Sequence, residues 1–175
     1  AFLAFISVPS VRVRTERSRE NHRMRRADRE HRRDAGPVTL EIRALRPDDR
    51  AAWDPLWHGY LVFYEEDLPD DITDLTWSRF FDDDEPMGAI GAFLDGNLIG
   101  ICHHHFHRST WARTTYCYLE DLFVSPDSRG GGTGRALIEA TADLARAAGA
   151  EKLYWHTRTD NATARALYDQ VATHV

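Results

Sequence analysis

The sequence predicts a mixed α/β (α+β) fold, with a mostly antiparallel central sheet flanked by helices. Several short stretches alternate apolar and polar residues, as strands do, and two of them are joined by a tight turn. A strand–helix–strand pattern follows them, and a hairpin combined with one such unit gives a mixed sheet rather than a doubly wound one. The 175 residues suffice for one domain with a real core.

The first half of the folded part predicts a strand, two helices and a hairpin. Residues 38–45 alternate apolar and polar side chains, which favours a strand. Residues 48–66 carry aromatic and leucine side chains at helical spacing, and a second short helix is expected around Asp74–Phe81. Residues 87–108 are predicted to form two strands, because the dipeptide Asp95-Gly96 between them strongly favours a hairpin turn.

The second half predicts one more strand of this set and then two helices around a further strand. Residues 114–124 are apolar enough for a central strand. A helix with one apolar face follows and ends near residues 148–150, and residues 152–157 form the next strand. Asn161 is expected to cap a last helix. The predicted inner face of that helix consists of Ala164, Leu167, Tyr168 and Val171.

Charge separates a basic N-terminal segment from an acidic remainder. Residues 1–36 carry a net charge of +5 and residues 37–175 a net charge of −11, which gives −6 overall. Residues 11–36 contain almost no large apolar side chains, so residues 1–37 are expected to form an Arg-rich, disordered tail before a folded domain at 38–175. Acids interspersed among the arginines argue against nucleic acid as a partner.

Composition also narrows the other partners and the compartment. No apolar run approaches the roughly 20 residues of a membrane helix, so no membrane partner is expected. The two cysteines, Cys102 and Cys117, give no disulfide framework and indicate a reducing, cytoplasmic environment. The acidic stretch Glu65–Glu85 is either a solvated loop or a region that attracts cationic substrates.

A glycine-rich turn precedes the helix that follows the central strand. It is not a Walker loop, because Arg135-Ala136 follows its last glycine, Gly134, in place of Lys-Ser/Thr. It also fails the dinucleotide fingerprint, because Arg135 stands where the third glycine is required. The turn still suits a diphosphate, since glycines let the backbone approach a ligand and the first amides of a helix are unpaired. Arg129 and Arg135 add cationic donors at its rim.

Two motifs in this order resemble the GCN5-related N-acetyltransferase (GNAT) superfamily from residue 38 onward. They are Val124-x-Pro126-x-x-Arg129-Gly130-x-Gly132-x-Gly134 and Asn161-x-x-Ala164-x-x-Leu167-Tyr168. The resemblance implies acetyl-CoA as cosubstrate, with its pyrophosphate on the amides of Arg129, Gly130, Gly131, Gly132, Thr133, Gly134 and Arg135. It implies that the pantetheine arm runs beside Leu122, Phe123 and Val124 and contacts Asn161. It also implies that the Val124 N–H polarises the thioester carbonyl.

Two residues are candidates for proton transfer. In the family the tyrosine that corresponds to Tyr168 commonly acts as general acid toward the departing thiolate, and the alternative is a core aromatic residue. Glu120 lies four residues before Val124, so strand alternation places both side chains on one face, where Glu120 could act as general base. The alternative for Glu120 is a surface or ion-paired carboxylate. Asp121 is expected on the opposite face, unless the strand bulges there.

The stretch "CHHHFH" raises the question of a metal site. His103, His105 and His107 share one face of the predicted strand, and alternate histidines can chelate a metal. No nearby carboxylate or cysteine pair completes a recognised spacing, so no metal is expected.

The acceptor is expected to be an amine. The stretch "CYLEDLFVSPDSRG" resembles the polyamine (spermidine/spermine) N-acetyltransferase branch, whose Glu-Asp pair helps to receive a cationic amine, which here makes Glu120 and Asp121 candidate substrate-binding residues. The resulting hypothesis is acetyl transfer to the primary amine of a small cationic acceptor, polyamine or amino-acid-like, by direct attack in a ternary complex. The alternatives are a protein or peptide amine acetyltransferase and a non-catalytic acyl-CoA-binding module.

One departure from the family concerns the end of the sheet. Family members continue past the tyrosine-bearing helix into two final strands, whereas this sequence stops at Val175. The sheet is therefore expected to lack its final two strands, which makes the domain at 38–175 C-terminally incomplete. The alternative is that a partner subunit supplies them, so a homodimer is a candidate assembly.

Overall fold

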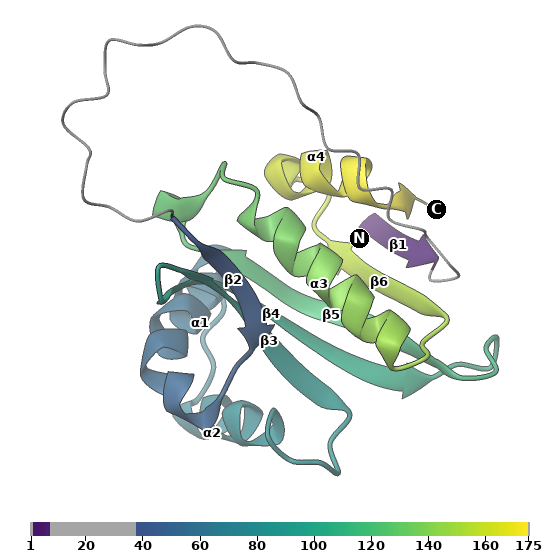
Figure 1. Ribbon diagram of the computed structural model, residues 1–175, viewed down its shortest axis with the longest axis horizontal. Helices are drawn as coiled ribbons and strands as arrows, with labels where there is room; N and C mark the ends of the chain where they lie inside the picture. The colour runs from purple at the N-terminus through teal and green to yellow at the C-terminus, as the bar shows by residue number, and fades with distance from the viewer. Residues whose placement is uncertain (1, 8–37, 175) are drawn as a thin grey trace, which may run out of the picture.

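A computed structural model describes residues 2–7 and 38–174, including the side chains of residues 38–172 (Figure 1). Its strands form one seven-stranded sheet in the order β2-β3-β4-β5-β6-β1-β7. The strands are β1 (Phe2–Ser7), β2 (Leu40–Ala44), β3 (Met87–Leu94), β4 (Asn97–Arg108), β5 (Thr115–Val124), β6 (Lys152–Thr157) and β7 (Thr173–His174). The helices are α1 (Arg50–Tyr64), α2 (Asp70–Arg79), α3 (Thr133–Ala147) and α4 (Ala162–Val171), with short 3-10 turns at Pro47–Asp49 and Pro126–Ser128.

The expected mixed and mostly antiparallel sheet is confirmed. Strands β5 and β6 pair in parallel, and the other neighbouring strands pair antiparallel. The β3–β4 hairpin turns at Asp95 and Gly96, whose φ angles of 48° and 81° lie in the left-handed region that such two-residue turns require. The strands predicted at residues 87–108, 114–124 and 152–157 are therefore present.

Two layers of helices cover the two faces of the sheet, and each encloses its own core. On one face, Trp53, Leu56 and Trp57 of α1 and Trp77 of α2 pack against Phe123 of β5. On the other face, the apolar side of α3 and the inner side of α4 pack on the opposite side of the same strands. This second core includes Leu137, Ile138, Ala142, Ala145, Leu153, Trp155 and Tyr168. Figure 1 shows α3 lying across the near face of the sheet and α1 behind it.

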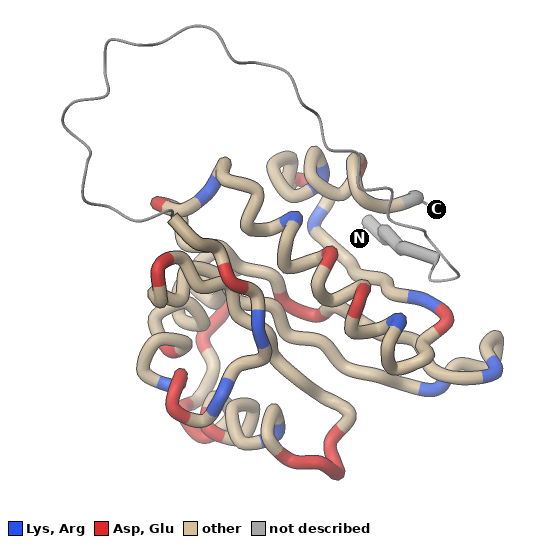
Figure 2. Tube along the Cα trace, in the orientation of Figure 1, with Lys and Arg blue, Asp and Glu red and all other residues tan. Residues whose placement is uncertain are grey.

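The second helix starts earlier than the sequence indicated. It was expected around Asp74–Phe81, but α2 spans Asp70–Arg79. Asp70 and Asp71 occupy its first turn directly after Pro69, where acidic side chains are favoured by the partial positive charge of the helix N-terminus. The acidic residues around α1 and α2 appear in red at the lower left of Figure 2, and those of the turn that follows α2 appear at its lower edge.

The first residues of the predicted N-terminal tail form a strand. Residues 8–37 lie outside the described residues, but residues 2–7 form β1, which pairs antiparallel with β6 from Phe2 opposite Thr157 to Ser7 opposite Lys152. The run "FLAFIS" is rich in residues that favour strands, and pairing satisfies the backbone groups at the edge of β6.

Strand β1 also changes the expected end of the sheet. After α4 the described chain adds only the two-residue β7, which pairs with β1 rather than with β6. The sheet therefore continues beyond β6 through a strand from the other end of the sequence.

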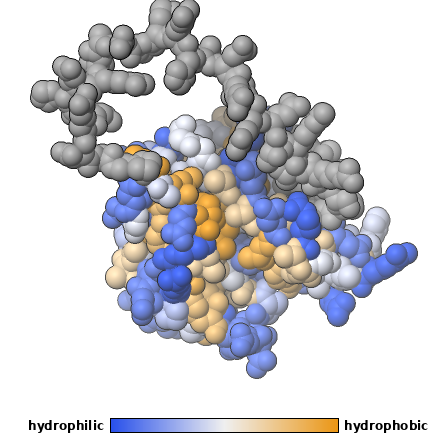
Figure 3. Space-filling view, viewed as in Figure 1, coloured by the Kyte–Doolittle hydropathy of each residue, from blue (hydrophilic) through white to orange (hydrophobic). Residues whose placement is uncertain are grey.

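In the space-filling view from the α3 side, the surface is mostly hydrophilic around an apolar area near its middle (Figure 3).

Candidate active site

A β-bulge in β5 determines where the acidic pair points. His103 of β4 lies opposite Asp121, whereas the next residue, His104, lies opposite Leu119. Glu120 is thus the extra residue of β5, without a partner of its own in this register. The bulge shifts by one residue which side chains of β5 face each side of the sheet. The apolar–polar alternation of the sequence does not reveal such a shift.

Because of the bulge, both carboxylates project toward the α1 side of the sheet. Oδ2 of Asp121 lies 2.9 Å from Nδ1 of His103, and Oε2 of Glu120 lies 3.2 Å from Nδ1 of His105. Val124, by contrast, packs with the core on the α3 side. The expectation that Glu120 and Val124 share a face, with Asp121 opposite, is wrong for this reason. The sequence prediction for Asp121 held only for a regular strand, and β5 has a bulge at this position.

The last residues of β5 present a backbone edge to the gap between β5 and β6. Pairing between these two strands covers only Tyr116–Tyr118 of β5. Beyond it, the Ser125 N–H donates to the Ile99 carbonyl at 2.9 Å, so in this antiparallel ladder Val124, opposite Gly100, is in a non-hydrogen-bonded position. The N–H of Val124 therefore points away from β4, toward the side on which β5 and β6 separate.

The glycine-rich turn presents backbone amides to the same region. Gly130 and Gly132 have φ angles of +82° and +86°, which glycine adopts without strain. Gly132 is the N-cap residue of α3, and the first hydrogen bond of that helix runs from the Ala136 N–H to the Gly132 carbonyl at 3.0 Å. The preceding amides, at residues 133–135, are the unpaired donors of a helix N-terminus and suit an anionic group.

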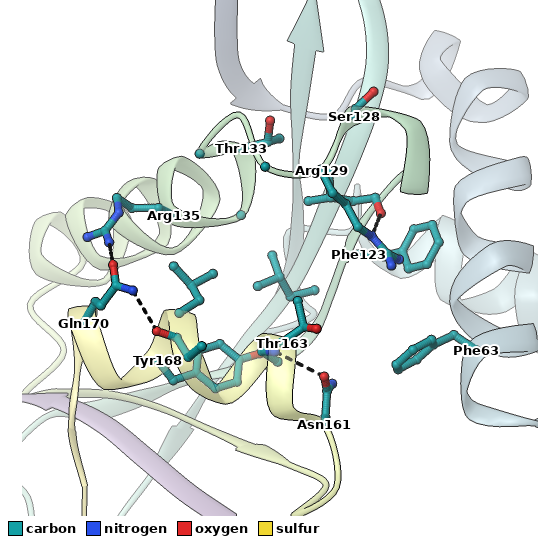
Figure 4. Close-up of a pocket in the computed structure, with 18 of the residues that line it drawn as sticks. Phe63, Phe123, Ser128, Arg129, Thr133, Arg135, Asn161, Thr163, Tyr168 and Gln170 are labelled. Atoms are coloured by element: carbon teal, nitrogen blue, oxygen red, sulfur yellow. Dashed lines mark hydrogen bonds between the residues drawn. The ribbon is translucent and has the colours of Figure 1, made fainter.

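These elements enclose a cavity of about 480 Å³ between the end of β5, the glycine-rich turn and α4 (Figure 4). The predicted residues in its wall are Leu122, Phe123, Val124, Arg129, Gly130, Gly132, Thr133, Gly134, Arg135, Asn161 and Tyr168. Gly131 lies in the same turn but is not part of the wall. A diphosphate at the turn and an extended chain beside the open edge of β5 both fit this arrangement.

The sequence is similar to a known protein family and to several of its members. A model of the acetyltransferase (GNAT) family matches residues 49–172. The chain belongs to the GNAT acetyltransferase family. It is 33% identical over 135 residues to the D-amino-acid N-acetyltransferase HPA3 of Saccharomyces cerevisiae, covering 76% of this chain and 84% of that protein. It is 29% identical over 130 residues to the aminoglycoside N(6')-acetyltransferase type 1 of Stenotrophomonas maltophilia, covering 73% and 81%.

Solved structures agree with the fold. A ribosomal-protein-alanine N-acetyltransferase from Brucella melitensis superposes with a TM-score of 0.64 at 26% identity, covering 78% of this chain and 93% of that one. AAC(6')-Iy in complex with a bisubstrate analogue that contains CoA superposes with a TM-score of 0.67 at 19% identity, covering 76% and 89%. The protein is thus an acetyl-CoA-dependent N-acetyltransferase of the GNAT type.

In this acetyltransferase Asn161 and the two arginines make local contacts around the cavity. The Asn161 side chain accepts a hydrogen bond from the Ala164 N–H at 3.2 Å and so caps α4, as the sequence predicted. Arg129 donates from Nε to the Val124 carbonyl at 3.0 Å, and Arg135 donates from Nη2 to Gln170 on α4 at 2.5 Å. Each guanidinium has further N–H groups besides the one used here.

Tyr168 lies in the wall of the cavity and in the core at the same time. Its side chain is buried, and its ring lies 5.2 Å from that of Trp155 between ring centres. Burial raises the pKa of the Tyr168 phenol, with smaller contributions from Tyr64 and Cys102. The hydroxyl therefore keeps its proton throughout the physiological pH range, and the acid role and the core role expected as alternatives are compatible.

A second cavity, of about 610 Å³, adjoins the first on the α1 side of the sheet. Its wall consists of Tyr60, Tyr64, Tyr118, Glu120, His156, Thr157, Arg158, Thr159 and Asp160. Tyr64 belongs to the walls of both cavities, so the two meet at the end of α1. Glu120 opens into the second cavity with 45% of its side chain exposed, and Arg158 forms an ion pair with Asp160 at 3.0 Å.

The phenols of the second cavity are all held in their neutral form. Burial, then the charge of Asp121, raises the pKa of Tyr60. The same two causes, in the same order, raise the pKa of Tyr64. Burial, then the charge of Glu120, raises the pKa of Tyr118. The phenols therefore add no formal charge to this cavity.

Sequence reasoning missed most of the second cavity. Tyr60 and Tyr64 are spaced by four residues on α1, and this spacing by itself indicates only helical periodicity. His156 lies within β6 and Arg158 directly follows this strand, and nothing in their spacing indicates a site. The segments meet only because the end of α1 crosses β5 next to β6.

The remaining sequence predictions concern metals and membranes. Among residues 38–172, no group of three or more His, Cys, Asp or Glu side chains is arranged to hold a metal ion. His103 and His105 instead contact Asp121 and Glu120, and His107 contacts Tyr154 through Nε2 at 2.9 Å. Within the described ranges, no helix has the length and apolar character of a bilayer span.

Proposed function

We propose that this protein transfers the acetyl group of acetyl-CoA to the primary amine of a small acceptor, polyamine or amino-acid-like, by direct attack in a ternary complex. The observation that carries the proposal is the pair of adjoining cavities, one with unpaired amides and a backbone edge, the other with carboxylates and tyrosines. Tyr64 lines both, so a donor and an acceptor could meet there without a covalent enzyme intermediate.

On the donor side, the amides at residues 133–135 and the arginines at 129 and 135 would hold the pyrophosphate. The backbone edge at Leu122–Val124 would pair with the pantetheine arm, and Asn161 lies beside it in the same wall. The N–H of Val124 would polarise the carbonyl oxygen on which negative charge develops. Bound acetyl-CoA supplies the acyl group as a thioester.

On the acceptor side, Glu120 and Asp121 would receive the ammonium group. An alkylammonium has a pKa of about 10, so it must lose a proton before its nitrogen can attack. Glu120 would be placed to take that proton, directly or through a water, because it lines the second cavity and 45% of its side chain is exposed. As the new C–N bond forms and the C–S bond breaks, Tyr168 would give its proton to the departing sulfur and regain one from the attacking nitrogen, directly or through water, which leaves a neutral amide, a free thiol and a neutral phenol.

The names of relatives bear on the acceptor. HPA3 is named for D-amino acids, and a relative from Caenorhabditis elegans, 36% identical over 80 residues, is named as a thialysine N-ε-acetyltransferase. An amino acid would offer its amine to Glu120 and Asp121 and its carboxylate to Arg158, which lies in the same wall. The amino-acid-like acceptor is for this reason the form of the proposal that we favour over a polyamine.

A protein or peptide amine is the second candidate, favoured by the match to a ribosomal-protein-alanine N-acetyltransferase. One assay separates the candidates: release of free thiol from acetyl-CoA with D- and L-amino acids, polyamines, aminoglycosides and alanine-terminated peptides. We expect turnover with amino acids. Turnover with peptides alone would favour the second candidate. Binding of acetyl-CoA without thiol release for any acceptor would indicate an acyl-CoA-binding module.

A further inference from the structure

A buried histidine lies directly behind the acceptor carboxylates. Only 2% of His103 is exposed, and its ring is surrounded by those of Trp53, Trp57 and Phe80, at 5.8, 5.2 and 4.7 Å between ring centres. Both ring nitrogens are engaged. Nε2 lies 2.9 Å from Nε1 of Trp53, and Nδ1 lies 2.9 Å from Oδ2 of Asp121.

These contacts assign the tautomer of the ring. The indole N–H of Trp53 can only donate, so Nε2 of His103 must accept and carries no proton. In a neutral imidazole the proton then resides on Nδ1, which donates it to Asp121. An imidazolium would set an N–H of His103 against the N–H of Trp53 inside an aromatic core, without an acceptor between them.

The Nδ1–H of His103 restrains the orientation of the Asp121 carboxylate. Its side chain is 14% exposed, at the bulge beside Glu120, and Tyr60 lies against the same carboxylate. A buried carboxylate is held in one orientation by the donors that reach it, and a displacement of about 1 Å at a reacting centre can cost about a hundredfold in rate. His103 is the donor that reaches Oδ2 from the core side.

We infer that His103 is a positioning residue for amine transfer: Trp53 fixes its tautomer, and the resulting Nδ1–H orients Asp121 toward the acceptor. His103, Trp53 and Asp121 are all absent from the walls of the two cavities, but Tyr60, which lies against the Asp121 carboxylate, lines the second one. The inference rests on the proposed function, because it assigns a role to a residue behind the acceptor carboxylate. In this proposal, the hydrogen bond from His103 keeps the Asp121 carboxylate in one orientation beside the bulge in β5.

Two substitutions separate positioning from packing. In His103→Asn the amide nitrogen takes the place of Nδ1 and can still donate to Asp121, but the contact with Trp53 is lost. In His103→Gln the terminal group reaches the place of Nε2 and can accept from Trp53, but the donor to Asp121 is lost. We expect His103→Asn to keep kcat/KM for the amine within about fivefold and His103→Gln to lower it about 10- to 100-fold, with the KM of acetyl-CoA unchanged in both.

His107→Asn and His107→Gln serve as matched controls on the same strand, because His107 lines neither cavity and does not contact Asp121. Both should remain within twofold of the unaltered protein. If His103→Gln retained as much kcat/KM for the amine as His103→Asn, or if both lost activity only in proportion to their unfolded fraction, His103 would be a packing residue and the inference would be overturned.

A second measurement does not depend on turnover. Long-range ¹H–¹⁵N correlation spectra of the unaltered protein at neutral pH report the tautomer of each histidine, and the short contact between the His103 ring and the Trp53 indole N–H, seen as a nuclear Overhauser effect, identifies the signals of His103. We expect the Nδ1–H form, and an Nε2–H or imidazolium pattern would overturn the inference even if neither variant folded. If no amine were acetylated by the unaltered protein, the proposed function would fail, while the spectra would still decide the tautomer.

Discussion

Replacement of Tyr168 by phenylalanine removes one oxygen from the wall of the donor cavity and leaves the ring in place. The ring fills the core against Trp155, and among the hydrogen bonds of the described residues none involves the Tyr168 hydroxyl. Tyr168→Phe should therefore change the free energy of unfolding by less than about 0.5 kcal/mol. A reduction in activity could then be assigned to chemistry.

The size of that reduction follows from the role of the hydroxyl. A positioned general acid contributes about 10²- to 10⁴-fold to the rate, which corresponds to about 3–5 kcal/mol of transition-state stabilisation. Burial raises the pKa of Tyr168, so the hydroxyl is protonated across the physiological pH range and its removal should lower kcat throughout that range.

The assay is thiol release at saturating acetyl-CoA and amine, with acetyl-CoA affinity measured by calorimetry. We expect kcat of Tyr168→Phe to fall at least about a hundredfold while the acetyl-CoA Kd stays within twofold. Tyr116→Phe is the control, because Tyr116 lies on β5 but outside both cavities. A kcat for Tyr168→Phe within threefold of the unaltered protein would refute the acid role and leave Tyr168 as a core residue.

Three further predictions concern the turn, the base and a buried histidine. Gly132→Ala places a side chain at φ +86°, with a strain of about 1–2 kcal/mol, and should raise the KM of acetyl-CoA at least fivefold, whereas Gly149→Ala, at φ +73° far from the cavity, should cost similar stability and leave KM unchanged. Glu120→Gln should lower kcat/KM for the amine about 10²-fold with acetyl-CoA affinity unchanged, and the exposed Glu139→Gln should have no effect; equal activity of the two variants would exclude Glu120 as base. Burial, then the neighbouring histidines, lowers the pKa of His104 to about 4. The unfolded chain takes up this proton near pH 6.5 and the folded one only near pH 4, so stability is lost as pH falls through this range, by about 2–3 kcal/mol at pH 4.5. Urea unfolding of His104→Leu should lack this loss, and a pH dependence identical to that of the unaltered protein would contradict the assignment.

Local sequence signals predicted the geometry of the glycine-rich turn and of the helix cap well. Gly130 and Gly132 have positive φ angles, and Asn161 caps α4, because turn and cap geometry depend on residues that are neighbours in the chain. The hairpin at Asp95-Gly96 was predicted for the same reason. The orientation of the acidic pair in β5 was predicted less well. The strand period alone put Glu120 on the face of Val124, and a one-residue bulge moved it to the other face.

The sequence by itself determined that this chain forms a mixed sheet with a glycine-rich turn before a helix and that it resembles GNAT acetyltransferases, since these depend on periodicity and on motifs of contiguous residues. Only the tertiary structure decided which residues lie around the two cavities beside that turn. The bulge in β5 turns Glu120 and Asp121 to one side, α1 brings Tyr60 and Tyr64 to them, and His103 supports Asp121 from a core built of three other segments. Contacts between residues distant in sequence depend on how strands register and helices cross, which local patterns do not encode. The pairing of β1 with β6 has the same cause, because an apolar run forms a strand where an open edge is available to it.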